Sequence, residues 1–187
     1  MEKLWSNFLK SFGAGLAIAI GALLYINIGG GVAGAIMFSI GIYLVLWFGL
    51  NLYTGKIGYI NSYKDIPNIL LIIIGNLIGC ALALISPATP FVISITAAKL
   101  AQPLYIIFVK AVICGILIYA GVDQYKKQKE YAPILAIPAF ILAGAEHSIA
   151  DACYFIAARA FSLEVVVFIL IVIIGNAIGS LLWRFLT

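Results

Sequence analysis

The residues best suited to chemistry in this chain lie together in one short stretch. Residues 144–151 read Gly-Ala-Glu-His-Ser-Ile-Ala-Asp and hold the only histidine, His147, beside Glu146, Ser148 and Asp151. Long apolar runs flank the stretch on both sides. Ionisable groups at membrane depth are costly and usually serve a transport pathway. Because an unperturbed imidazole has a pKa of about 6.5, His147 is a candidate to exchange a proton with a passing solute.

The composition places the flanking runs in a lipid bilayer. Of the 187 residues, 65% are hydrophobic and 10% are charged, whereas a soluble domain is about half apolar and a quarter charged. Each span needs about 20 apolar residues, so roughly six spans use nearly the whole chain. We expect an all-α integral membrane protein that forms a single membrane domain over residues 1–187.

Several function classes find no support in the sequence. Cys80, Cys114 and Cys153 lie in apolar runs without paired spacing, which indicates neither a disulfide nor a metal site. The sequence holds no catalytic nucleophile, metal cluster or phosphate-binding loop, so we expect no enzyme and no cofactor. The net charge of +4 is interpreted as a signal of membrane topology and not of nucleic-acid binding.

Six apolar segments are expected to cross the membrane as helices. Their approximate ranges are 11–28, 32–50, 66–85, 103–122, 132–160 and 165–183. We expect a loop at 86–102 and a charged loop at 123–130. The fifth segment is longer than one straight crossing needs, and Pro133, Pro138 and Gly144 are expected to break it.

The distribution of lysine and arginine predicts the orientation of these spans. With the N-terminus inside, the basic residues on the inner side are Lys3, Lys10, Lys56, Lys64, Lys126, Lys127, Lys129 and Arg184. Lys99 and Arg159 lie on the outer side, and Lys110 lies within a span. Basic residues concentrate on the cytoplasmic side of membranes. We therefore expect a multi-pass protein of the cell inner (plasma) membrane with both termini in the cytoplasm.

An internal repeat divides the chain into two halves. Residues 72–79 read Ile-Ile-Ile-Gly-Asn-Leu-Ile-Gly, and residues 172–179 read Val-Ile-Ile-Gly-Asn-Ala-Ile-Gly. Halves of three spans each insert with opposite polarity, which predicts an inverted 3+3 repeat of residues 11–86 and 103–186. Helices 2 and 5, the middle span of each half, are interrupted at 51–56 and 144–151, and such paired interruptions indicate a permeation site.

Polar residues beside the interruptions are expected to support the backbone. Asn76 and Asn176 occupy the same place in the two copies of the repeat. Irregular backbone at membrane depth must be hydrogen-bonded within the protein. We expect these two asparagines, and Ser148 near the second interruption, to have structural roles next to the site.

At these residues the chain resembles the formate/nitrite transporter family. The resemblance is carried by Leu-Tyr-Thr-Gly at 52–55, by both Gly-Asn-x-x-Gly motifs, and by Ala-Gly-Ala-Glu-His-Ser-Ile-Ala at 143–150. It implies an aquaporin-like six-helix protomer, a homopentamer and one pore in each protomer. It also implies passage of small monovalent anions such as formate, nitrite or hydrosulfide, as the neutral acid through the narrowest part. The family's longer N-terminal helix and C-terminal tail find no match, so the chain resembles a short member.

The resemblance implies roles for individual residues. The family's central histidine matches His147, and its loop threonine matches Thr54. Its lysine ahead of the fourth span matches Lys99, and the glutamate beside the histidine matches Glu146.

Two apolar positions match as well, and two polar positions depart from the pattern. The constriction phenylalanine matches Phe140, and Leu52 matches a loop residue that narrows the pore. The asparagine of a Cys-Asn pair in the fourth span is replaced by Gly115, and the asparagine after the histidine string is replaced by Asp151. Both replacements bear on the choice of substrate.

His147 and Thr54 also have structural interpretations. His147 either neutralises the anion, directly or by a relayed proton, or is a core histidine that hydrogen-bonds Thr54. Thr54 either fixes the His147 tautomer, binds a substrate oxygen, or caps a short helix that resumes at Gly55.

The charged candidates leave similar alternatives open. Lys99, paired with Glu146, and Lys110 either raise the local anion concentration or serve as structural partners that reach the interface. Asp151 is either neutral, paired with Lys110, or selective for a different solute.

Two functions compete on these grounds. The first is a channel or transporter for small weak-acid anions or their neutral acids, with protonation near His147. The alternative is an aquaporin-like facilitator of small neutral solutes, because Gly115 would widen the pore and Asp151 would disfavour anions. A scaffold role would leave His147 and the interruptions unexplained.

Overall fold

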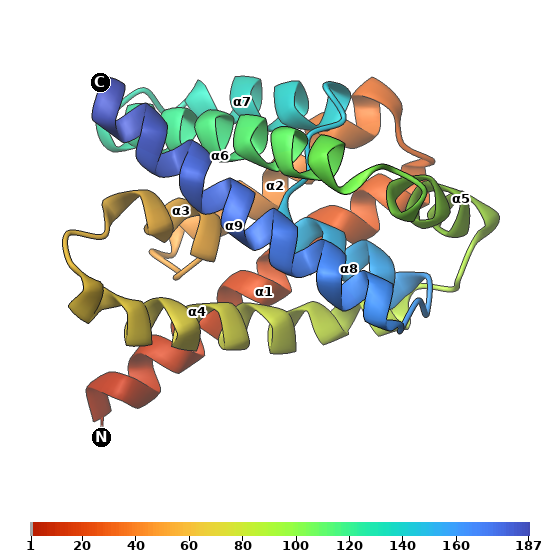
Figure 1. Cartoon of the computed structure of the whole chain (residues 1–187), viewed down its shortest axis with the longest axis horizontal. Helices are drawn as coiled ribbons and strands as arrows, with labels where there is room; N and C mark the ends of the chain where they lie inside the picture. The colour runs from red at the N-terminus through yellow and green to blue at the C-terminus, as the bar shows by residue number, and fades with distance from the viewer. Residues whose placement is uncertain (1) are drawn as a thin grey trace.

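The structure is a computed structural model that describes residues 2–187. The chain folds into α-helices and short 3₁₀ helices joined by turns (Figure 1), so the expectation of an all-α protein is confirmed. In chain order the elements are α1 (Glu2–Ile28), α2 (Gly31–Trp47), α3 (Tyr53–Lys56), η1 (Ile57–Tyr59), η2 (Tyr63–Asp65), α4 (Ile66–Gly79), η3 (Cys80–Ile85), α5 (Pro90–Leu100), α6 (Leu104–Lys126), α7 (Ala132–Leu142), α8 (Ser148–Ala157) and α9 (Leu163–Leu186).

The helices differ in whether they can cross a bilayer alone. Within residues 2–187, four segments are long and apolar enough by length and composition, namely Glu2–Ile28, Tyr63–Ile85, Leu104–Lys126 and Leu163–Leu186. In contrast, α2 has 17 residues and α7 has 11. At 1.5 Å per residue these two helices rise about 26 Å and 17 Å, less than the hydrocarbon thickness of about 30 Å. Each is followed, after a break, by a short helix, α3 or α8.

Two matched helix crossings hold the molecule together. α1 packs against α4, and α6 packs against α9 (Figure 1). A Cβ on Gly15 would collide with the backbone of Asn76 on α4, and a Cβ on Gly115 would collide with the backbone of Asn176 on α9. Small residues allow such close approach of helices in membranes. Gly115 is therefore a crossing glycine, and the expectation that it widens a pore is wrong.

The interruptions begin earlier in the chain than the sequence predicts. The first was predicted at 51–56, but the break covers 48–52 and Tyr53–Lys56 is helical. The second was predicted at 144–151, but the break covers 143–147 and α8 has begun by Ser148. Gly49 and Gly144 have φ of +59° and +64°, a left-handed conformation that ends helices and that glycine adopts without strain.

The segment 86–102 was predicted as a loop, and this prediction is wrong. It contains α5, whose first residue is Pro90 and whose N-cap Thr89 accepts a hydrogen bond from the Val92 N–H. Proline is favoured in the first turn of a helix, where its missing N–H has no intrahelical partner to lose. α5 lies at the end of the molecule opposite both chain termini (Figure 1).

Asn76 and Asn176 bridge the two breaks with matching sets of hydrogen bonds. The Asn76 Nδ2 donates to the carbonyls of Ser11 and Asn51, and its Oδ1 accepts from the Tyr53 N–H at 2.8 Å. Asn176 Nδ2 donates in the same way to the carbonyls of Ala111 and Glu146, and its Oδ1 accepts from the Ser148 N–H at 3.0 Å. Each fully buried side chain thus ties a broken backbone to two long helices.

Removal of either asparagine side chain should destabilise the fold strongly. Asn76→Ala leaves one N–H and two carbonyls without this partner in a buried setting, at about 1–3 kcal/mol for each group left unsatisfied. We expect a loss of about 3 kcal/mol or more in the free energy of unfolding, measured by denaturation in detergent micelles, and a similar loss for Asn176→Ala. The control is Asn68→Ala, whose side chain makes an exposed hydrogen bond to Asn7. Equal stability of Asn76→Ala and Asn68→Ala would contradict the bridging role.

Candidate functional site

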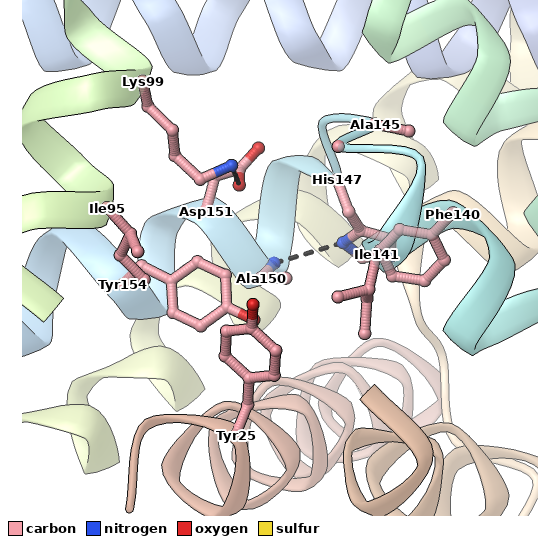
Figure 2. A pocket seen from close by; sticks show the side chains of 11 residues that line it. Tyr25, Ile95, Lys99, Phe140, Ile141, Ala145, His147, Ala150, Asp151 and Tyr154 are labelled. Carbon is pink, nitrogen blue, oxygen red and sulfur yellow. Dashed lines mark hydrogen bonds and ion pairs between the residues drawn. The ribbon is translucent and has the colours of Figure 1, made fainter. Parts of the chain in front are cut away.

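His147 lies where the second break meets α8, and both of its ring nitrogens are engaged. It is the N-cap residue of α8, and its Nδ1 accepts a hydrogen bond from the Ala150 N–H at 3.1 Å (Figure 2). Its Nε2 lies 2.9 Å from Thr54 Oγ1. Because Nδ1 is an acceptor, the neutral imidazole carries its proton on Nε2 and donates it to Thr54. The Thr54 hydroxyl proton then remains free to point elsewhere.

Thr54 and His147 bring the two short helices together. Thr54 lies inside α3, whose N-cap residue is Leu52, so Thr54 does not cap this helix with its side chain. Its side chain is fully buried, as is that of His147. The hydrogen bond joins the start of α3 to the start of α8. Of the three interpretations of Thr54, helix capping is excluded, and the other two are compatible with this geometry because Oγ1 accepts from Nε2 while its own proton is free.

Apolar residues flank this polar pair. The Phe140 ring stacks on the His147 ring, with centroids 5.6 Å apart, and Figure 2 shows the two side by side. Phe38 packs edge-on against Phe140 with a centroid separation of 6.2 Å. Leu52, at the other break, is also buried. Phe140 and Leu52 therefore lie where they could act as constrictions next to His147 and Thr54.

Each of the two breaks lines a cavity. The histidine cavity has a volume of about 160 Å³, and its lining includes His147, Phe140, Lys99, Asp151 and Tyr154. The lysine cavity has a volume of about 140 Å³, and its lining includes Leu52, Ile42, Lys56, Val122 and Lys126. Each cavity has room for a few water molecules or one small solute.

A buried charged cluster forms one wall of the histidine cavity. Lys99, which reaches down from α5 in Figure 2, forms ion pairs with Glu146 and, at 2.9 Å, with Asp151. The Gln102 side chain donates to Glu146 Oε1 at 3.1 Å and accepts from Lys110. The predicted pairing of Lys99 with Glu146 is thus present in the structure. Asp151 pairs with Lys99, and the alternative that it pairs with Lys110 is wrong.

Three residues of the site were not singled out from the sequence. Gln102 links Lys110 to Glu146, and Tyr25 and Tyr154 contribute rings 5.7 Å apart to the cavity wall. Gln102 falls in the segment that was predicted as a loop. Recognition of α5, from Thr89 and Pro90, would have placed Gln102 at a helix end near Lys99. No sequence signal distinguishes Tyr25 or Tyr154 from the other tyrosines of the chain.

The remaining predicted residues lie close to the site without lining it. Ser148 donates its backbone N–H to Asn176, and its buried hydroxyl has no hydrogen-bond partner within residues 2–187. Gly115 lies at the crossing of α6 with α9, where Ser180 Oγ donates to its carbonyl at 3.1 Å.

The chain is similar in sequence and in fold to known membrane channels. A family model described as formate/nitrite transporter matches residues 1–187. A solved structure described as an FNT family ion channel superposes with a TM-score of 0.86 at 23% identity, covering 97% of this chain and 88% of its own. A pentameric formate channel with formate bound superposes with a TM-score of 0.86 at 20% identity, covering 99% of this chain and 96% of its own. No curated protein sequence matches the chain significantly.

The tautomer of His147 can be tested directly because the chain has a single histidine. We expect ¹⁵N NMR of histidine-labelled protein at neutral pH to show a protonated Nε2 and an unprotonated Nδ1, because Nδ1 accepts from Ala150. Thr54→Val should change the Nε2 signal, since the acceptor of its proton is lost, whereas Thr96→Val should leave it unchanged. A proton on Nδ1 would contradict the arrangement.

Proposed function

This chain belongs to the formate/nitrite transporter family, and from that premise we propose that it is a membrane channel for small monovalent weak-acid anions. The substrate class is that of formate, nitrite or hydrosulfide. The proposed path runs through one domain, residues 1–187, from the histidine cavity to the lysine cavity. It passes the His147–Thr54 pair, with Phe140 and Leu52 as the apolar constrictions.

The observation that carries this proposal is the hydrogen bond between His147 and Thr54, which joins the break that lines the histidine cavity to the helix after the break that lines the lysine cavity and is flanked by apolar side chains. A bare anion cannot cross an apolar constriction cheaply, but the neutral acid can. The pair offers a hydroxyl whose proton is free to bind an oxygen or sulfur atom of the solute. Neutralisation next to this pair would therefore lower the barrier at the point where the path is driest.

The charged residues are given distinct parts in this proposal. Lys99 and Lys110 supply positive potential on the histidine-cavity side, and Glu146 holds Lys99 in place. Lys56 and Lys126 supply positive potential in the lysine cavity. Positive walls raise the local concentration of anions. Glycine at position 115 and serine at 148 serve the fold around the path.

We further propose the topology that the sequence predicts. Six spans would form an inverted 3+3 repeat, aquaporin-like, with α2–α3 and α7–α8 as the interrupted crossings. Both chain ends lie at one end of the molecule in Figure 1, which supports an even number of crossings. Both termini would face the cytoplasm and the protein would reside in the inner membrane, on the basis of its lysine and arginine distribution. A pentamer is proposed by analogy with the formate channel.

One observation favours a second candidate, a facilitator of small neutral solutes. Lys99 is shared by two carboxylates, so its charge is not free to hold an anion in the histidine cavity. Proteoliposomes separate the two functions, because a pH-sensitive dye reports entry of formate, nitrite or hydrosulfide with a proton, whereas light scattering reports the volume change on entry of glycerol or water. We expect anion-dependent pH changes well above those of empty vesicles. Glycerol or water flux alone would overturn the anion proposal.

The contribution of His147 can be isolated from its role in the fold. Asn is a good N-cap residue, so His147→Asn can still accept from the Ala150 N–H while the Nε2–H is lost. Without the Nε2–H, the Thr54 hydroxyl is no longer held beside the path, and loss of a buried hydrogen bond costs about 1–3 kcal/mol, so we expect formate flux to fall roughly tenfold to a hundredfold. The control is Ser162→Asn, a change of N-cap at the start of α9, where Ser162 accepts from the Val165 N–H. Undiminished flux in His147→Asn would remove the histidine from the mechanism.

A further inference from the structure

Two buried carboxyl groups share one ammonium group in the histidine cavity. Glu146 and Asp151 are each about 1% exposed, and both contact Lys99. Two carboxylates that share a site strongly disfavour ionisation of both, and burial adds to that penalty. The position of Asp151 at the start of α8 favours a negative charge on its carboxyl group. The free-energy cost of desolvating a second carboxylate is larger and opposes that charge. The pair is therefore expected to hold one proton.

The hydrogen bonds indicate which carboxyl group holds this proton. Both oxygens of Glu146 accept from donors, Oε2 from Lys99 and Oε1 from Gln102. The orientation of the Gln102 amide is fixed, because its oxygen faces Lys110 and its nitrogen must then face Glu146. An ionised carboxylate accepts at both oxygens, and this is the arrangement of Glu146.

Asp151 differs from Glu146 in one oxygen. Its Oδ1 accepts from Lys99, whereas its Oδ2 is buried and has no hydrogen-bond partner in the part of the chain that the structure describes. A buried carboxylate oxygen that accepts no hydrogen bond is costly. A protonated carboxyl oxygen is instead a hydrogen-bond donor, which an acceptor outside the protein can bind. Asp151 lines the histidine cavity, and Figure 2 shows its carboxyl group beside Lys99. Oδ2 itself is covered, so a solute in the cavity can accept this proton once the Asp151 side chain turns toward the cavity.

From this geometry, and resting on the channel function proposed above, we propose that Asp151 is a carboxylic acid that donates the Oδ2 proton to the incoming anion. The step is a proton transfer from Asp151 Oδ2–H to an oxygen or sulfur atom of the anion, which yields the Asp151 carboxylate and the neutral acid. The neutral acid moves on past His147. Water on the side of the histidine cavity then returns a proton to Asp151, so that one proton accompanies each anion.

The charge balance of the cluster couples the two events. With Asp151 protonated, Lys99 and Lys110 oppose only the charge of Glu146, and the cavity wall is net positive. With Asp151 ionised, the two lysines are balanced by two carboxylates. Anion and proton therefore favour each other's binding, and this coupling is reciprocal. The other titratable groups that surround Asp151 are His147, Tyr25 and Tyr154 on the cavity wall and the buried thiols of Cys114 and Cys153.

The dependence of formate flux on external pH tests this role. At fixed total formate, Asp151→Asn can take only acid that is already neutral in bulk, and this fraction falls about tenfold per pH unit above the pKa of the acid. We expect its flux to follow that fall, while the wild-type flux changes little until Asp151 itself loses its proton. Asp65→Asn, the same change at a partly exposed acid in η2 and away from the cavity lining, should keep the wild-type profile. Parallel profiles for Asp151→Asn and wild type would overturn the proposal.

Infrared difference spectroscopy tests for the proton on the Asp151 carboxyl group without any measurement of transport. We expect a protonated carboxyl C=O band in the wild type at neutral pH that is lost in Asp151→Asn and kept in Asp65→Asn. Glu146→Gln should also lose the band, because Asp151 would then pair with Lys99 alone and ionise. Absence of the band from the wild type would overturn the placement of the proton. A wild type that shows the band but moves no anion would overturn the proposed channel function instead.

Discussion

The whole structure depends on the need to satisfy broken backbone inside a membrane. Lipid offers no hydrogen bonds, so every N–H and carbonyl freed at an interruption must find a partner within the protein. Asn76 and Asn176 meet this need, and each also ties its break to a long helix through Ser11 or Ala111. Because the asparagines fix the breaks, they also fix the residues on them. The positions of Leu52 and His147 follow from this constraint.

The repeat was readable from the sequence because its motif is part of this constraint. Glycines at fixed spacing around each asparagine let the helices approach, and an asparagine without a partner would be too costly to keep. The same reasoning predicted that the breaks lie near polar residues, but their ends were misplaced. The polar stretch at each break extends into the first turn of the helix that follows. For this reason Tyr53–Lys56 and the start of α8 were predicted as irregular, although both are helical.

Other features could not be predicted from single segments. Gly115 replaces an asparagine of the family pattern, and this replacement suggested a wider pore. The neighbour of Gly115 is instead the backbone of α9, which only the tertiary packing reveals. Segment 86–102 contains Pro87, Pro90 and a polar end, a composition typical of a loop, although Thr89 and Pro90 start a helix. Consequently Gln102 was missed. The pairing of Lys99 with Glu146 came from family resemblance, whereas its second partner, Asp151, emerged only from the fold.

The matched halves share a scaffold and differ in the side chains that it carries. Leu52 and His147 are the N-cap residues of α3 and α8, and the backbone groups on either side of each are held by an asparagine. In the same register, four residues further on, Lys56 faces the lysine cavity and Asp151 the histidine cavity. One scaffold thus presents an apolar residue and a fixed cation on one side, and an imidazole and a carboxyl group on the other. The imidazole and the carboxyl group therefore line one cavity, whereas Lys56 and Lys126 line the other.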